Sequence, residues 1–395
     1  MNKILIPKEV NSKLTMIYAK SGSRQEPANI KGISHFIEHM LFKGTPTKTA
    51  KEISYSIERY GAQFNAWTDY ELTAYWIKSA NKYKGKAEAL LMDMLYNSFF
   101  PQVEIDKERN VILQEMNMYE DDPRSSVGEI FQKALYKETD GLYSSIIGTV
   151  QSLTNINRTT LLDYYKNRYK DLTFLQIGEV VRGPAGPKGV SYNKNVEIAT
   201  KVPNTKELKG RNDVIVKRAG INQANVIIGN TIRPLGKNSL DTMVLTDLLE
   251  GVMNDMSGRL FSKVREENYL CYRIYFSLGG YSCGTLNWGV SLGLNAAQIN
   301  KAYDLIMGEL TREISDAEIE YSISKKIGER AINNDNLNSL ASYTAYLDLK
   351  GIDYKEYLFN YEKYAREQAK NLREFAKSIN FTDNVVAQLI PEGEK

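Results

Sequence analysis

Histidine, cysteine and long apolar segments are all scarce in this sequence. Its 395 residues include two histidines and two cysteines. Cys271 and Cys283 are too few for a disulfide framework in a chain of this length, so we expect two unreactive buried thiols, with a pair across neighbouring strands as the alternative. No apolar run approaches the roughly 20 residues of a membrane-spanning helix, which argues against a membrane protein.

An excess of charge of one sign is also missing. The 51 lysines and arginines and the 48 acidic residues leave a net charge of +3. This balance gives no electrostatic reason to expect nucleic acid as a partner. The N-terminal segment lacks the continuous apolar core and the small-residue cleavage site of a secretory signal, so we expect a cytoplasmic protein without a membrane partner.

Length and composition indicate a globular chain with two domains. A chain of 395 residues exceeds what one hydrophobic core usually organises, and 42% of its residues are hydrophobic. Glycine and proline are concentrated at 181–190, which is typical of a linker or an exposed loop. We therefore predict a first domain at 1–182, a linker at 183–198 and a second domain at 199–395.

Strand patterns and helix patterns are mixed in both halves of the chain. The first half is expected to contain strands at 14–19 and 172–178, two strands joined near Asp69, and helices at 33–42, 104–120 and 126–137. The second half is expected to contain helices from Ser239 onward and strands at 213–219, 224–230, 270–293 and 384–390. This mixture favours an α+β fold with two related domains, each a mainly antiparallel sheet packed with helices.

The two histidines stand four residues apart, as His35 and His39, and Glu38 directly precedes the second. Two histidines placed at random in a chain of this length would fall at this spacing in about one chain in 200, so chance is a poor explanation. The ordinary alternative is a pair of surface or core histidines. Their spacing instead matches two ligands of one metal ion on consecutive turns of a helix.

Helical geometry separates this segment into two faces. With about 100° per residue, His35, Glu38 and His39 share one side. The opposite side carries an apolar stripe made of Ile33, Phe36, Ile37, Met40 and Leu41. A helix that is buried by its apolar stripe would therefore present both imidazoles and the carboxylate together.

The helix expected at 104–120 offers a third ligand. Glu108 and Glu115 are seven residues apart and so share one face, which also carries apolar residues such as Ile112. A buried ionised carboxylate without a partner is strongly unfavourable, so such groups pair with a cation or bind a metal. Either glutamate could instead form a salt bridge with Arg109 or another basic residue.

Two histidines and one carboxylate leave a fourth zinc position for water, which is typical of catalytic zinc sites. Zinc lowers the pKa of that water, and a nearby carboxylate can accept its proton as the water attacks a carbonyl group. Glu38 lies on the same helical face as the histidines. We therefore predict that Glu38 is the general base and that it passes the proton to the leaving amine.

With these residues in place, the chain resembles the inverzincin metallopeptidases of the pitrilysin and insulinase family, most closely the branch that contains mitochondrial processing peptidase. The family's H-x-x-E-H order occurs at 35–39. The similarity continues through GAQFNAWTDYELTAY at 61–75 and an E-R-x-V-I-x-x-E segment at 108–115. The resemblance implies one zinc ion per chain, with Glu115 as the third ligand and Glu108 as a carboxylate that supports the site.

The resemblance also implies substrate-binding residues. An edge strand to which the substrate adds as a further strand would contain Phe64, Asn65, Ala66 and Trp67. In the second half, an R-E-x-x-x-L-x-Y segment places Arg265 and Tyr272 where the family binds the substrate backbone near the cleavage point. From the sequence pattern alone, Arg265 reads as a solvated helix residue and Tyr272 as a core residue.

The predicted function is that of a zinc-dependent endopeptidase for extended, unfolded peptides or presequence-like segments. In the family, four related domains enclose a chamber, which implies that two chains of this length associate. A homodimer is the simpler expectation and a heterodimer with a related subunit is the alternative. The alternative functions are a non-catalytic assembly subunit of the same fold and a zinc-dependent module that captures peptides without cutting them.

Overall fold

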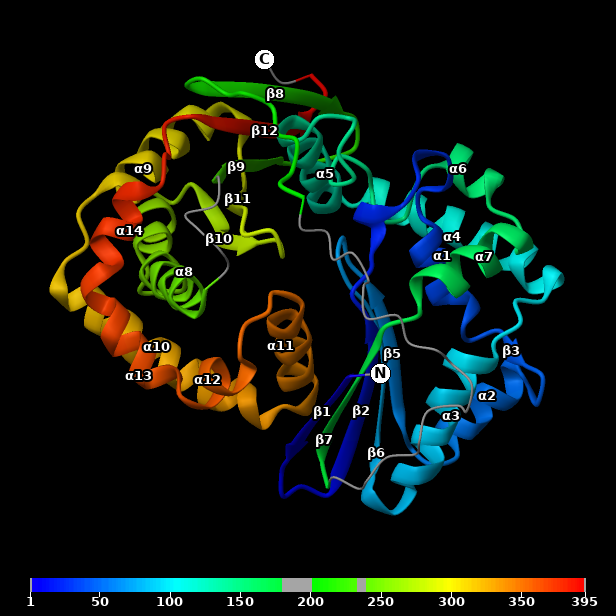
Figure 1. The fold of residues 1–395 in the computed structure, drawn as a ribbon. Helices are drawn as coiled ribbons and strands as arrows, with labels where there is room; N and C mark the ends of the chain where they lie inside the picture. Colours follow the sequence, from blue (N-terminus) through cyan, green and yellow to red (C-terminus); the bar gives the residue numbers. More distant parts are fainter. Residues whose placement is uncertain (1, 180–200, 233–238, 394–395) are drawn as a thin grey trace. The chain divides into compact units, whose positions relative to one another are not determined.

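The computed structural model describes residues 2–179, 201–232 and 239–393, and Figure 1 shows their fold. Contacts group the chain into two compact units that interleave along the sequence. The predicted boundary at 181–190 and the predicted linker at 183–198 lie outside the described residues. The first unit contains Met1–Asn117, Ser144–Thr200 and Asp335–Leu349, and the second contains Met118–Tyr143, Lys201–Asn334 and Lys350–Lys395.

The sheet of the first unit has five strands in the order β1-β7-β2-β6-β5. β1, which the sequence patterns did not predict, runs parallel to β7, and the other neighbours are antiparallel. β5 is an edge strand, so one side of its backbone faces away from the sheet. The strands are β1 (Asn2–Pro7), β2 (Ser12–Ala19), β5 (Gln63–Thr68), β6 (Thr73–Ala80) and β7 (Leu172–Gly178).

One face of this sheet packs against helices, among them the predicted helices at 33–42 and 104–120, which are confirmed as α1 and α4. Ile17 and Phe174 from the sheet meet Phe36 of α1 and Ile112 of α4 in one buried apolar core. The elements of this layer are α1 (Ile33–Met40), α2 (Ala50–Glu58), α3 (Lys84–Asn97), α4 (Gln102–Asp121), α6 (Val150–Asn155), α7 (Arg158–Arg168) and the hairpin of β3 (Gly44–Thr45) and β4 (Lys48–Thr49).

The opposite face of the same sheet is covered by α11 (Leu337–Leu349), which comes from the C-terminal half of the chain and packs against β2 and β7 (Figure 1). Side chains alternate along a strand, so Leu14, Met16 and Tyr18 face this side, whereas Ile17 joins the other core. All of these side chains are fully buried. Since each contributes roughly 1.5–3 kcal/mol when buried, α11 is part of what stabilises the first sheet.

The second unit repeats this design. Its sheet has the order β10-β11-β9-β12-β8, with β8 parallel to β12 and the other neighbours antiparallel. Two related units with mainly antiparallel sheets and packed helices confirm the predicted α+β fold. The strands are β8 (Arg211–Arg218), β9 (Ala224–Ile232), β10 (Cys271–Gly280), β11 (Leu286–Leu294) and β12 (Asn384–Pro391). The helices are α8 (Leu240–Met253), a π-helix (Phe261–Glu266), α9 (Ile299–Thr311), α10 (Asp316–Asp335), α12 (Tyr354–Phe359), α13 (Tyr361–Gln368) and α14 (Leu372–Ser378).

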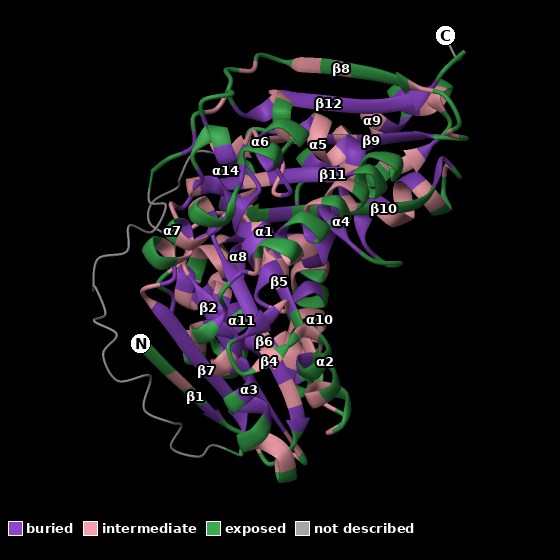
Figure 2. Cartoon of the chain, turned by 90° about the vertical axis from the view of Figure 1, so that its right-hand side faces the viewer, coloured by how far each residue is buried: buried purple, intermediate pink, exposed green. Residues whose placement is uncertain are grey.

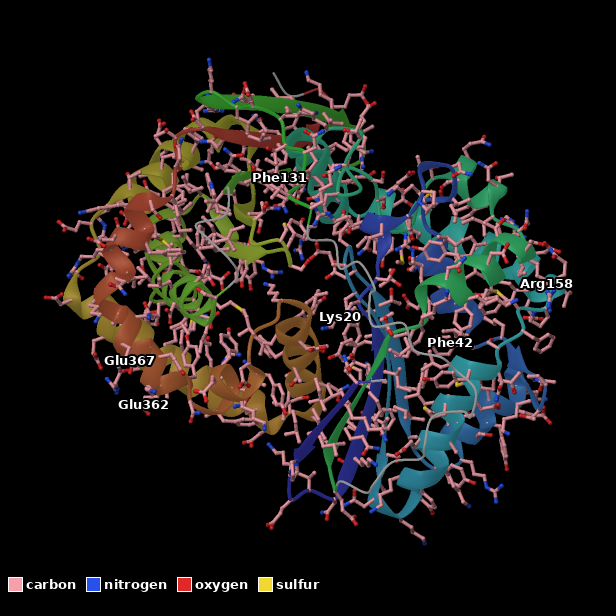
Figure 3. All side chains as sticks on the ribbon, in the orientation of Figure 1. Lys20, Phe42, Phe131, Arg158, Glu362 and Glu367 are labelled. Atoms are coloured by element: carbon pink, nitrogen blue, oxygen red, sulfur yellow. The ribbon has the colours of Figure 1, made fainter. Side chains whose placement is uncertain are left out.

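Two helices join a different unit from the one that their sequence position suggests. α5 (Pro123–Leu135), predicted at 126–137 within the first domain, packs against β9 and β12 of the second sheet. Its Phe131, labelled in Figure 3, lies over Gly229, where an added Cβ would stand 2.8 Å from the phenyl ring. Conversely, α11 lies in the C-terminal half of the sequence but belongs to the first unit. Helical periodicity reveals the buried face of such a helix but not the sheet that buries it.

How far a strand is buried depends on its position in the sheet. Figure 2 shows β2, β7 and β12 as buried strands and β8, at the edge of the second sheet, as largely exposed. Among the described helices, none combines the length and the apolarity that crossing a bilayer requires. Both cysteines are free thiols, so the alternative of a disulfide is wrong. The expectation of two buried thiols holds for Cys271 only, because Cys283 is partly exposed.

Candidate metal centre

α1 presents the two faces that its sequence predicts. Ile33, Phe36 and Ile37 are fully buried against the sheet. On the other side of the helix, His35 and His39 are only partly buried, and so is the predicted general base, Glu38. Packing of the apolar stripe therefore fixes the rotation of α1, and that rotation directs both imidazoles away from the core.

The N-terminus of α1 is held by a carboxylate that the sequence analysis missed. Glu26 accepts hydrogen bonds from the backbone N–H groups of Gly32 and Ser34, each at 2.7 Å. Gly32 has φ of 89°, and a Cβ there would lie 2.3 Å from the carbonyl oxygen of Ile147. Burial raises the pKa of Glu26 to about 7 although these backbone donors favour its charged form. Only the glycine before the helix hinted at this arrangement.

α4 brings Glu115 to the two histidines. Its Oε2 lies 3.7 Å from Nε2 of His35 and 3.3 Å from Nε2 of His39. The two imidazole centroids are 4.7 Å apart. Within the described parts of the chain, these three side chains form the one group of histidine, cysteine or acidic residues whose ligand atoms converge for a metal, all within 4.8 Å of one another.

These separations fit a zinc ion. Zinc binds imidazole nitrogen and carboxylate oxygen at about 2.0–2.1 Å in tetrahedral geometry, which sets neighbouring ligand atoms about 3.3 Å apart. Both distances from Glu115 are close to this value. The donor set, two neutral nitrogens and one carboxylate, is also one that zinc prefers.

A second carboxylate and a lysine orient His39. Glu108 lies 3.0 Å from Nδ1 of His39, and Lys43 pairs with the other oxygen of Glu108 at 2.6 Å. In the neutral imidazole, a proton on Nδ1 leaves the lone pair of Nε2 to bind a metal. Arg109, considered above as a partner for the two glutamates, instead donates to the backbone carbonyl groups of Leu153 and Ile156. Lys43 follows His39 by four residues, but no sequence pattern had marked it as part of the site.

The two imidazoles differ in their electrostatics. Burial lowers the pKa of His35 to about 4, and the neighbouring His39 adds to this effect. Burial also acts to lower the pKa of His39, but hydrogen bonds with Glu108 and Glu115 outweigh it and raise that pKa to about 9. Nδ1 of His35 is buried and has no hydrogen-bond partner among the described residues.

Glu38 is held by the end of the edge strand. The hydroxyl of Thr68, the last residue of β5, donates to Oε2 of Glu38 at 2.5 Å. Burial raises the pKa of Glu38, and this hydrogen bond opposes the shift. A carboxylate with a raised pKa is suited to accepting a proton. No sequence pattern pointed to Thr68, because its contact with Glu38 spans 30 residues.

The predicted substrate strand lies where the resemblance places it in the sheet. β5 contains all four residues and pairs with β6 on one side only. Ala66 is buried, Asn65 is exposed, and Phe64 packs edge-on against Phe42 with ring centroids 4.5 Å apart. Trp67 directly precedes the threonine that contacts Glu38. The edge strand thus ends at the candidate metal centre.

Arg265 and Tyr272 belong to the second unit. The guanidinium of Arg265 lies between two aromatic rings, 4.4 Å from the centroid of Phe261 and 4.9 Å from that of Tyr272. Tyr272 is 83% exposed, so the interpretation of this residue as core is wrong. Arg265 is partly exposed. An exposed aromatic ring beside a guanidinium is suited to binding a peptide.

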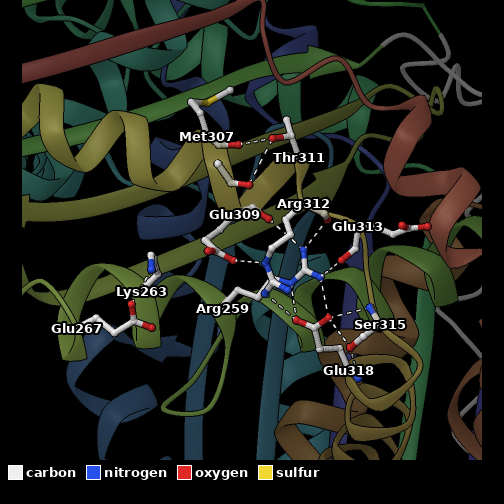
Figure 4. Close-up of polar contacts among 11 residues, drawn as sticks. Arg259, Lys263, Glu267, Met307, Glu309, Thr311, Arg312, Glu313, Ser315 and Glu318 are labelled. Carbon is white, nitrogen blue, oxygen red and sulfur yellow. Dashed lines mark hydrogen bonds and ion pairs between the residues drawn. The ribbon is translucent and has the colours of Figure 1, made fainter.

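The segment that carries Arg265 is anchored by a buried arginine, as Figure 4 shows. Arg259 donates to the carboxylate of Glu318 and to the backbone carbonyl groups of Glu309, Arg312 and Glu313. These carbonyls lie at and just after the end of α9, where backbone acceptors lack partners within the helix. Arg259 also holds the pKa of Glu318 far below its usual range. No sequence pattern pointed to Arg259.

Comparison with known proteins places these features in a family. The model of the insulinase family, peptidase family M16, matches residues 7–150, and the model of the peptidase M16 inactive domain matches residues 155–326. A Bacillus subtilis protein named uncharacterized zinc protease YmxG is 33% identical over 340 residues, which cover 82% of this chain and 80% of that protein. The beta subunit of mitochondrial-processing peptidase from Bos taurus is 34% identical over 183 residues, or 46% of this chain and 36% of the subunit.

Solved structures agree with the fold. The crystal structure of a protease from Helicobacter pylori superimposes with a TM-score of 0.87 at 18% identity and covers 98% of this chain and 97% of its own. A peptidase M16 inactive domain from Pseudomonas fluorescens gives 0.79 at 15% identity, with 100% and 95% covered. These structures share the fold, and the family models together with the Bacillus relative show that the chain belongs to the insulinase family of peptidases, M16.

Proposed function

We propose that this chain is a zinc-dependent endopeptidase that cleaves extended peptides. His35, His39 and Glu115 hold the zinc ion, one per chain, and Glu38 is the general base. The observation that carries the proposal is the convergence of these three ligand atoms at zinc spacing beside Glu38. Relatives of this chain are named zinc proteases, which supports the choice of metal.

The residues around the ion have separate tasks in this mechanism. Zinc, when bound, supplies a Lewis acid that activates water and polarises the scissile carbonyl. Thr68 holds Oε2 of Glu38, so Oε1 is the atom that accepts the proton from the attacking water and returns it to the leaving amine. Glu108, neutralised by Lys43, keeps the proton of His39 on Nδ1 and so orients the ring.

The edge strand supports an extended substrate. A peptide that pairs with β5 contributes main-chain hydrogen bonds that do not depend on its sequence, and folded proteins offer few such strands. Residues Phe64 to Trp67 would align it, and the strand ends at Thr68 beside the base. Arg265 and Tyr272 are proposed to bind the substrate backbone, on the strength of the family resemblance and their exposed stack.

A non-catalytic subunit that binds peptides or supports assembly is the second candidate. The match of residues 155–326 to a domain called inactive favours it. The full set of ligand and base residues in the first unit favours the enzyme, because a subunit without catalysis has no need of Glu38.

One experiment separates the two. Zinc-loaded protein is incubated with a mixed library of unfolded peptides, with and without a chelator, and fragments are identified by mass spectrometry. The enzyme is expected to produce fragments that disappear with the chelator and with Glu38→Gln, while Glu38→Gln still binds one zinc per chain. Absence of chelator-sensitive fragments from the zinc-loaded wild type would reject the peptidase and leave the binding subunit.

A further inference from the structure

α11 is attached to the first sheet by polar contacts as well as by apolar packing. The hydroxyl of Tyr18 on β2 donates to Asp348 at 2.6 Å, and Lys20, labelled in Figure 3, pairs with the same carboxylate at 3.1 Å. Near the other end of the helix, Lys78 on β6 donates to Asn338 at 3.1 Å. These contacts fix where α11 lies along the sheet.

One further contact reaches the turn between β5 and β6. The hydroxyl of Tyr346 donates to Oδ2 of Asp69 at 2.6 Å, across 277 residues of sequence. Burial and the Asp69 carboxylate raise the pKa of Tyr346, so its hydroxyl keeps its proton and remains a donor. A short hydrogen bond to a charged acceptor is among the stronger polar contacts in proteins.

Asp69 organises this turn. Its Oδ1 accepts from the N–H of Tyr70 at 2.7 Å, and its own N–H donates to the carbonyl of Leu72 at 2.7 Å. From the other side, the N–H of Ser23 donates to the carbonyl oxygen of Asp69 at 3.1 Å. The backbones are so close that a Cβ on Gly22 would lie 2.1 Å from that oxygen. The turn is therefore held between the segment at Gly22 and the phenol of Tyr346.

The residue directly before Asp69 is Thr68, whose hydroxyl holds Glu38 at 2.5 Å. A shift of the turn would move the Thr68 hydroxyl and, with it, the oxygen of Glu38 that it holds. Misplacement of a reacting group by about 1 Å can cost around a hundredfold in rate. The hydroxyl of Tyr346 reaches this turn from the C-terminal half of the chain.

We propose that Tyr346 is a positioning residue for the general base. Its hydrogen bond to Asp69 fixes the turn and thereby orients the Thr68 hydroxyl toward Glu38. The inference rests on the proposed peptidase function. It links a helix made late in the chain to the reacting carboxylate, and it predicts that loss of one phenolic hydroxyl lowers turnover without loss of zinc.

The test compares Tyr346→Phe with Tyr18→Phe. Both changes remove a hydroxyl that makes a 2.6 Å hydrogen bond between α11 and the first sheet, but only the first bond ends on the turn. Tyr346→Phe is expected to lower kcat about tenfold, with KM changed less than twofold and zinc content unchanged. Tyr18→Phe is expected to change kcat less than twofold. Equal effects of the two substitutions would overturn the proposal.

Two further measurements sharpen the test. If Tyr346 acts through Thr68, adding Tyr346→Phe to Thr68→Val should cost no more than Thr68→Val alone, and additive losses would contradict this route. Amide hydrogen exchange at residues 66–72 should rise in Tyr346→Phe and not in Tyr18→Phe. Amide exchange can be measured whether or not the protein cleaves peptides. An inactive wild type would therefore reject the proposed peptidase function, whereas unchanged exchange in Tyr346→Phe would reject the positioning role of Tyr346.

Discussion

Because Glu26 accepts hydrogen bonds from the start of α1, the stability of the chain should depend on pH. One substitution should remove this dependence. Glu26 is 5% exposed, and both of its oxygens accept backbone hydrogen bonds at the start of the helix that carries the two histidines. Glutamine has nearly the shape of the protonated acid and does not titrate, but its amide nitrogen cannot accept a hydrogen bond. The change Glu26→Gln therefore removes the ionisation and also one of the two backbone hydrogen bonds, and the cost of that lost bond does not depend on pH.

The magnitude follows from the pKa. In the folded chain the pKa of Glu26 is raised from 4.5 to about 7, so the folded state binds this proton more tightly than the unfolded state. The resulting stability is complete below about pH 4.5 and is lost as the pH rises through about 7. At 1.36 kcal/mol per pH unit, the free energy of unfolding of the wild type should fall by about 2.5 kcal/mol from pH 5 to pH 8 through this group alone.

The assay is urea unfolding of both chains at several pH values in a fixed concentration of chelator. Trp67 and Trp76 lie in the first unit and report on it by fluorescence. We expect the free energy of unfolding of Glu26→Gln, relative to that of the wild type, to rise by about 2.5 kcal/mol between pH 5 and pH 8. If this difference stayed constant or fell as the pH rose, the two backbone donors would outweigh burial and the reasoning would be refuted.

Three other predictions follow from the site and the fold. Glu108→Gln should weaken zinc binding about 10- to 100-fold, measured by competition with a chelating dye, and an unchanged affinity would show that this carboxylate does not orient its histidine. A fragment of residues 1–182 lacks α11 and should show no sharp near-ultraviolet circular dichroism, since one face of its sheet is uncovered; a cooperative unfolding transition would contradict this. If two chains share a site, mixing Glu38→Gln with Arg265→Ala chains should restore activity that neither has alone, and no gain on mixing would exclude sharing.

The metal centre was predictable where its geometry is local. His35 and His39 are one turn apart, so their convergence needs only a helix and a buried stripe. Glu115 was found because a carboxylate on the buried side of a long helix needs a partner, and the structure brings it within 3.7 Å of both rings. The family resemblance, not the residue pattern, separated the role of Glu115 from that of Glu108.

The residues that orient these groups were not predictable in the same way. Glu26, Thr68 and Tyr346 act through contacts that depend on how the chain folds back on itself, and a hydroxyl or carboxylate in a loop carries no periodic signal. The same limit applies to the helices. α5 and α11 were recognisable as helices, but the sheet that each one covers is decided by tertiary packing.

The order in which a ribosome synthesises this chain therefore differs from the order in which its elements can pack together. The histidine pair lies at positions 35 and 39, yet the helix that covers the other face of its sheet ends at residue 349. Until then the nascent strands expose Leu14 and Met16 to solvent and to other nascent chains. The sheet that carries the histidine helix is therefore covered on both faces only after Leu349 has been synthesised.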